Sequence, residues 1–113
     1  MALPHSPQSQ QSARWPRFID ELRRRLIAAG ARRIYLFGSY ARGEADEDSD
    51  VDVVVIKDTP LPFFERLREV SACLDPDWPV DLLVYTPAEF ERMCREGNAF
   101  AELISEEGVL VHG

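Results

Sequence analysis

The strand predicted at residues 50–57 constrains the fold of this chain more than any other segment. It contains the run VDVVVI, which is typical of a central strand that is covered on both faces. Helical spacing of apolar residues follows at 60–74, and a second apolar strand, VDLLVY, is predicted at 80–85. A strand, a helix and a strand in this order form a right-handed crossover unit, which makes the two strands parallel.

Flanking segments extend this unit into a small sheet. Helical spacing predicts a helix at 15–29 that ends at Gly30, and the sequence RIYLF predicts a strand at 33–37. The loop that joins 33–37 to 50–57 has about a dozen residues, so these two strands can pair antiparallel. In the helix at 60–74, the apolar spacing predicts the following buried side chains: Phe63, Phe64, Leu67, Val70, Ser71 and Leu74.

The C-terminal part of the sequence predicts two further helices. Thr86–Glu89 is a capping box with proline at the first helical position, so we expect a helix that runs to about Arg95. A short helix at 98–105 and an edge strand at 109–111 follow it. The predicted fold class is therefore α/β or α+β, with helices packed on a small mixed β-sheet.

Composition excludes several classes of protein. The 113 residues carry a net charge of −7, which argues against a direct nucleic-acid binder. The longest apolar stretch is far shorter than the ~20 residues of a membrane-spanning helix, and two isolated cysteines make no metal-binding spacing. Residues 1–13, rich in Pro, Gln and Ser, predict a disordered tail before a single domain at 14–113. No signal-peptide pattern is found, so we expect a cytoplasmic protein.

Aspartates at two strand starts are the first candidate site residues. Asp50 and Asp52 flank Val51, and because side chains alternate along a strand, both carboxylates point to the same face. Asp81 opens the parallel strand, which starts at the same edge of the sheet. Carboxylate oxygens are hard ligands that Mg²⁺ binds together with waters and phosphates. The alternative for each residue is a solvated aspartate at a strand end.

Gly38 and Ser39 form the second candidate element. A glycine that ends a strand lets the backbone approach a ligand closely, and Ser39 opens a short helical turn whose amides and hydroxyl can hold phosphate oxygens. Arg42 can add positive charge to a triphosphate, or it can pair with Glu44 or Asp46. Other acidic residues are expected to form turns rather than to bind a ligand: Asp46, Glu47, Asp48, Asp58, Asp75 and Asp77.

Together these residues predict metal-assisted attack on a nucleotide phosphate. In this interpretation two Mg²⁺ ions clamp the reacting phosphate, and Asp50 and Asp52 hold the metals and the triphosphate. Asp81 holds the catalytic metal and helps to deprotonate an acceptor hydroxyl. Ser39 and the turn amides stabilise the leaving pyrophosphate. The sequence lacks the P-loop pattern GxxxxGK[ST], which excludes that class of nucleotide-binding enzyme.

The stretch from Gly38 to Val55 resembles the signature of the minimal nucleotidyltransferases of the polymerase-beta nucleotidyltransferase superfamily. That signature runs Gly-Ser-x-Ala-Arg-Gly, a short variable loop, then Ser-Asp-x-Asp and an apolar strand. This sequence matches it at Gly38, Ser39, Ala41, Arg42, Gly43, Ser49, Asp50 and Asp52. Asp81 fits the third carboxylate, which the family carries on a following strand. The resemblance implies a polymerase-beta-like fold with these aspartates as catalytic metal ligands.

The resemblance also implies a partner. Small members of this family are often antitoxins of a HEPN-domain ribonuclease toxin, and they resemble enzymes that transfer AMP from ATP to a tyrosine hydroxyl of that toxin. We therefore expect ATP as substrate, Mg²⁺ as cofactor, a hetero-oligomer with the toxin, and no membrane partner. Two alternatives stay open: a module that neutralises its partner by contact alone, and nucleotidyl transfer to a small molecule or RNA.

Overall fold

The computed structural model describes residues 15–46 and 48–113, so the tail predicted at 1–13 lies outside the described residues. The elements follow one another in the order α2 (Phe18–Ala28), β1 (Arg33–Phe37), α3 (Ser39–Arg42), β2 (Val51–Ile56), α4 (Phe63–Ser71), β3 (Val80–Tyr85), α5 (Pro87–Arg95), α6 (Ala99–Glu107) and β4 (Val109–His112). None of the helices in these two ranges is long and apolar enough to cross a bilayer.

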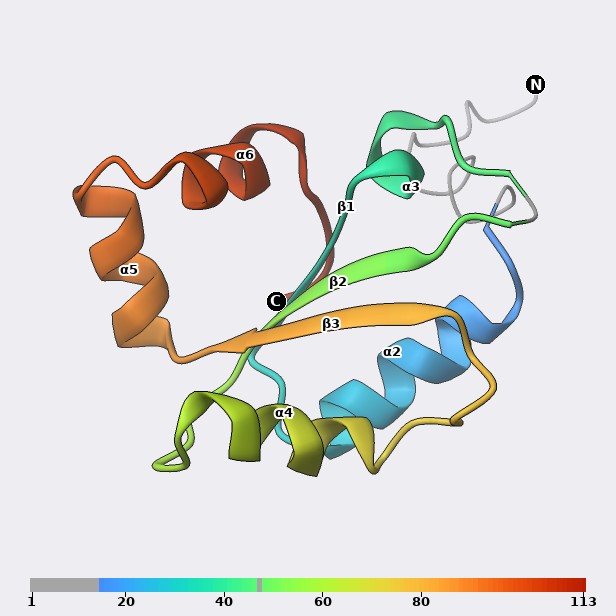
Figure 1. Cartoon of the computed structure of the whole chain (residues 1–113), viewed down its shortest axis with the longest axis horizontal. Coiled ribbons are helices and arrows are strands. Elements are labelled where there is room, and N and C mark those ends of the chain that lie inside the picture. Colours follow the sequence, from blue (N-terminus) through green and yellow to red (C-terminus); the bar gives the residue numbers. More distant parts are fainter. Residues whose placement is uncertain (1–14, 47) are drawn as a thin grey trace, which may run out of the picture.

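The strands of the described residues form one mixed sheet in the order β3-β2-β1-β4 (Figure 1). The strand β2 pairs parallel with β3, and β1 pairs antiparallel with both β2 and β4. The predicted crossover unit, the antiparallel first strand and the C-terminal edge strand are therefore confirmed. The mixed α/β fold class is confirmed with them.

The central strand β2 separates two apolar clusters. Val51, Val53 and Val55 pack with residues of α2 and α4 on one face of the sheet. Val54 and Ile56 pack with residues of α5 and α6 on the other. Figure 1 shows α2 and α4 on one side of β2 and β3, and α5 and α6 on the other side. The prediction that this strand is covered on both faces is confirmed, and the alternation aims Asp52 toward the α5–α6 face.

Two helices begin three residues later than predicted, and proline explains both differences. The helix α2 begins at Phe18, and Trp15 precedes Pro16; α4 begins at Phe63, and Leu61 precedes Pro62. Helical backbone angles are unfavourable for a residue that precedes proline, so each helix begins only after its proline.

The predicted buried face of α4 is wrong at two positions. Phe64 is 75% exposed and Ser71 is exposed, whereas Val70 is buried as expected. Among the aromatic rings of the described residues, Phe64 lies near Phe63 alone, in a T-shaped arrangement. Phe63 also lies against Tyr85. The helix is therefore rotated so that its charged residue Arg66 faces inward.

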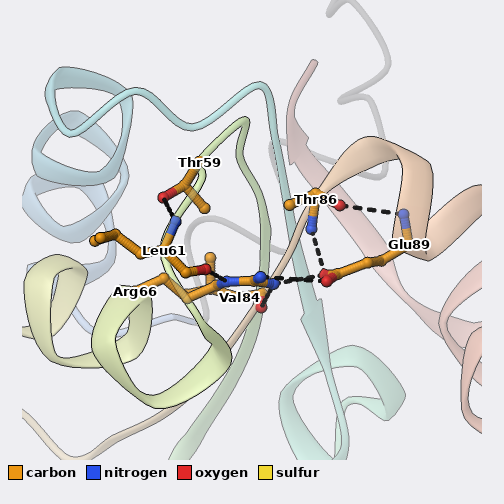
Figure 2. A network of polar contacts seen from close by, with 6 residues as sticks. All are labelled: Thr59, Leu61, Arg66, Val84, Thr86 and Glu89. Atoms are coloured by element: carbon orange, nitrogen blue, oxygen red, sulfur yellow. Dashed lines mark hydrogen bonds and ion pairs between the residues drawn. The ribbon is translucent and has the colours of Figure 1, made fainter.

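Arg66 is the buried charged residue of the described chain, and it ties α4 to β3 and α5 (Figure 2). Its Nε donates to the carbonyl of Leu61 at 3.0 Å, and its terminal nitrogens donate to the carbonyl of Val84 and to the carboxylate of Glu89. Glu89 also accepts from the Thr86 amide at 2.9 Å, which completes the predicted capping box. This network fixes the C-terminal end of β3, whereas Asp81 lies at the start of the same strand.

Candidate active site

Asp52 and Asp81 lie opposite each other at the starts of β2 and β3, as the parallel register requires. Asp52 is half-buried and Asp81 is exposed. Burial raises the pKa of Asp52, and the charges of Asp81 and Asp50 raise it further, whereas Arg42 acts in the opposite direction. Asp52 is therefore a carboxylate whose ionised form needs a counter-charge at this edge of the sheet.

Asp50 is exposed and directly precedes β2, at the end of a loop that is held by its own side chains. The Ser49 hydroxyl accepts from the Asp46 amide at 3.0 Å and donates to the Asp46 carboxylate at 3.1 Å. That carboxylate also accepts from the Asp48 amide at 2.9 Å. Asp46 thus forms a turn, as predicted. The positioning role of Ser49 was not predicted, although serine three residues after aspartate is a common turn signal.

Gly38 brings the backbone against Asp52. It follows β1, whose last residue, Phe37, is the register partner of Asp52. Its φ of +69° and ψ of −144° belong to a region that is essentially restricted to glycine. A Cβ at this position would overlap Oδ2 of Asp52. The sequence predicts a close approach of this backbone to a ligand, and the group that the structure places against Gly38 is the carboxylate of Asp52.

The short helix α3 places Ser39 next to Gly38 and is anchored by Tyr40. Tyr40 is buried in the apolar cluster that contains residues of α2 and α4. Burial raises the pKa of its hydroxyl, and the charges of Asp46 and Asp50 raise it further. Sequence reasoning did not single out Tyr40, because an aromatic residue in a short turn carries no distinctive signal. It supports the turn that presents Ser39.

Arg42 pairs with the neighbouring Glu44, whose Oε1 lies 2.5 Å from its Nε. Both side chains are about half exposed. The sequence left open whether Arg42 contacts a triphosphate or pairs with a nearby acidic residue. In the structure it forms the local ion pair. Exposed pairs of this kind contribute only ~0–1 kcal/mol, so the contact is easily exchanged for another anion.

The donor set of this edge suits a hard divalent cation. In residues 15–46 and 48–113, no group of three or more His, Cys, Asp or Glu side chains is spaced to hold a metal ion. The structure instead assembles the pair of Asp52 and Asp81, with Asp50 at the exposed entrance to β2. Mg²⁺ commonly takes one or two carboxylates from a protein and its other ligands from waters and substrate phosphates, so the pair fits this ion.

A comparison with known families decides the affiliation of this chain. Residues 16–111 match the family described as nucleotidyltransferase domain. The chain belongs to this family. The predicted membership of the minimal nucleotidyltransferases is therefore confirmed, and the match covers every residue of the candidate site.

Curated relatives carry the name protein adenylyltransferase. A relative from Methanocaldococcus jannaschii is 62% identical over 79 residues, which are 70% of this chain and 77% of the relative. The protein adenylyltransferase MntA of Thermococcus cleftensis is 63% identical over 57 residues, 48% of this chain and 54% of that protein. A relative from Haemophilus influenzae, named probable protein adenylyltransferase MntA, is 36% identical over 67 residues, 56% of this chain and 59% of that protein. The chain thus spans little more than half the length of the latter two.

Solved structures share the fold at low sequence identity. A nucleotidyltransferase structure from Sulfolobus solfataricus has a TM-score of 0.61 at 21% identity and covers 95% of this chain and 87% of its own. A toxin–antitoxin structure with AMP-PNP has a TM-score of 0.54 at 22% identity and covers 83% of this chain and 73% of its own. These likenesses confirm a nucleotidyltransferase fold.

Proposed function

We propose that this chain is a Mg²⁺-dependent nucleotidyltransferase that transfers AMP from ATP to a tyrosine hydroxyl of a HEPN-domain toxin and thereby acts as its antitoxin. The observation that carries the proposal is the pairing of Asp52 and Asp81 beside the Gly38–Ser39 turn. Two neighbouring carboxylates without a bound cation repel each other and lower the stability of the fold. A function in which they bind a cation therefore explains their presence better than packing does.

The three aspartates have distinct places in this proposal. Asp52 and Asp81 hold Mg²⁺ from the sheet, and Asp50, at the mouth of the same strand, holds the ion that accompanies the triphosphate. When bound, Mg²⁺ supplies charge neutralisation for the phosphates and orients them for attack. The Ser39 hydroxyl and the free amides of the turn donate to phosphate oxygens, and Arg42 exchanges Glu44 for a phosphate.

The transfer step is a displacement at phosphorus. The acceptor hydroxyl oxygen forms a bond to the α-phosphorus of ATP while the bond to the pyrophosphate oxygen breaks. The carboxylate of Asp81, which is the exposed member of the pair, accepts the hydroxyl proton and releases it to solvent. Pyrophosphate leaves with the Ser39 turn as its donor set.

A protein acceptor is supported by what the relatives and neighbours are called. Relatives at 62% and 63% identity carry the name protein adenylyltransferase, and a neighbour of the same fold is a toxin–antitoxin structure with AMP-PNP. The HEPN identity of the toxin and the tyrosine acceptor come from the family resemblance of the Gly38–Val55 signature.

Nucleotide binding is tested by thermal unfolding with and without Mg²⁺ and ATP. A ligand at about 100 times its dissociation constant stabilises a protein by ~2.7 kcal/mol, which raises the melting temperature by several degrees. We expect this shift in the wild type and its loss in Asp52→Asn and Asp81→Asn. Asp58→Asn is the matched control, because Asp58 follows the other end of β2 and, within the described residues, its ion pair is with the exposed Arg32. No shift in the wild type would contradict the proposal.

Transfer is tested by co-expression with the toxin. The intact mass of toxin purified with the wild-type chain is expected to increase by whole AMP units, and toxin purified with Asp52→Asn is expected to stay unmodified and toxic. Equal neutralisation by both chains without added mass would favour the module that acts by contact alone.

A further inference from the structure

A cavity of about 640 Å³ lies on the α5–α6 face of the sheet. Tyr35, Ile56 and Phe90 give it an apolar lining, and Phe90 belongs to the apolar cluster of this face. Arg33 and Ser105 supply polar groups at its border. This volume falls within the range of sites that enclose small organic ligands.

The cavity is separate from the candidate active site. Along β1, Arg33 is the register partner of Ile56, whereas Phe37 is the partner of Asp52. The two places are therefore four residue steps apart along β1, about 13 Å along the sheet. The ring of Phe100 packs edge-on against Phe37 at 5.4 Å on this face. A ligand in the cavity would not touch the carboxylate pair.

The border of the cavity has a localised positive charge. None of the ion pairs in the described part of the chain involves Arg33, whereas its neighbour Arg32 is bound to Asp58 at 3.0 Å. Glu91 also lines the cavity, but its carboxylate faces Arg95 at 3.9 Å. The Ser105 hydroxyl lies 3.9 Å from the Cys94 sulfur and can turn toward a ligand. An uncompensated arginine is notable in a chain with a net charge of −7.

We propose that this cavity binds a small organic anion with a flat apolar body, of the class of aromatic carboxylates. The carboxylate meets Arg33 and the Ser105 hydroxyl, and the aromatic body lies against Tyr35 and Phe90, whose rings are themselves packed at 6.0 Å. The inference goes beyond the proposed function, since it concerns another ligand at another site and holds whether or not AMP is transferred.

The charge requirement is tested by calorimetric titration with 2-naphthoate and its neutral amide, 2-naphthamide. We expect saturable binding of one naphthoate per chain, with the amide at least fivefold weaker, which is the ~1 kcal/mol of an exposed charged contact. Arg33→Gln is expected to remove this preference for the acid. Arg68→Gln, which removes an exposed arginine from α4, is the matched control and is expected to bind like the wild type. Equal affinity for acid and amide would overturn the proposal.

The location is tested with the two free cysteines, both of which are exposed. Cys94 lines the cavity and Cys73 does not. With iodoacetamide and mass spectrometry, saturating naphthoate is expected to slow alkylation of Cys94 severalfold and to leave Cys73 unchanged. Equal rates with and without naphthoate would overturn the proposal. The proposal would also be overturned if a co-purified protein, but not naphthoate, protected Cys94 from alkylation, because the cavity would then be a protein-docking site.

Discussion

Gly38→Ala is expected to destabilise the protein and to disturb Asp52 at the same time. The backbone of Gly38, with φ of +69° and ψ of −144°, costs a residue with a Cβ ~1–3 kcal/mol. The new Cβ would also overlap Oδ2 of Asp52, and turning that side chain away from its rotamer costs a further ~0.5–1.5 kcal/mol. The expected loss in the free energy of unfolding is therefore roughly 2–4 kcal/mol.

Gly43→Ala is the matched control for backbone strain. Gly43 also has a positive φ, +73°, but its ψ of 22° lies in the left-handed helical region, and a Cβ there would meet nothing within 4 Å. Its expected cost is about 1–2 kcal/mol. In urea denaturation, the midpoint of Gly38→Ala is expected to lie below that of Gly43→Ala by on the order of 1 M.

A double-mutant cycle separates the overlap from the strain. Asp52→Ala removes the oxygen that the new Cβ would meet, so in that background Gly38→Ala is expected to cost about 1 kcal/mol less than in the wild type. If Gly38→Ala costs the same in both backgrounds, the contact between Gly38 and Asp52 does not limit the choice of residue, and the reasoning is refuted.

Three further predictions concern the α4 side of the molecule. Glu89→Gln is expected to lower the free energy of unfolding by about 2 kcal/mol in urea, because it leaves the buried Arg66 without its anion. The hydrogen bond from Arg66 holds the pKa of Glu89 below its usual 4.5. The stability that the ionised Glu89 contributes is therefore fully present above pH 4.5 and is lost as the pH falls through its lowered pKa, so the wild type and Glu89→Gln are expected to become equally stable as the pH is lowered from 5 across that pKa. A constant difference across this range would contradict that cause. Phe64→Ser is expected to change stability by less than about 0.5 kcal/mol, whereas Phe63→Ser costs more than about 1 kcal/mol; equal losses in thermal melts would contradict the observed rotation of α4.

The parts of the fold that follow from local pattern could be predicted from the sequence. The apolar runs at 51–56 and 80–85 are unambiguous, and the connection between them requires parallel pairing. Parallel pairing in turn places Asp52 beside Asp81. The capping box at Thr86–Glu89 needs only two residues at a fixed spacing. Each of these features depends on neighbours in the chain or on a topological rule.

The features that were missed depend on contacts between distant residues. Apolar spacing assigned Phe64 to the core and left Arg66 outside, because it weighs each side chain by its own polarity. The partner of Arg66 is Glu89, 23 residues away, and this pairing makes burial of the arginine acceptable. The overlap between Gly38 and Asp52 is likewise visible only when β1 lies on β2. Ser49 differs, because its turn is local and could have been recognised.

The most direct test of the proposed activity compares ATP labelled at the α-phosphate with ATP labelled at the γ-phosphate. The purified chain is incubated with Mg²⁺ and its toxin, with Asp52→Asn as the inactive variant and Asp58→Asn as the active control. We expect the toxin to acquire the α-label and not the γ-label, and only with the wild type and Asp58→Asn. Transfer of the γ-label, or α-label incorporated equally by Asp52→Asn, would contradict the proposed activity.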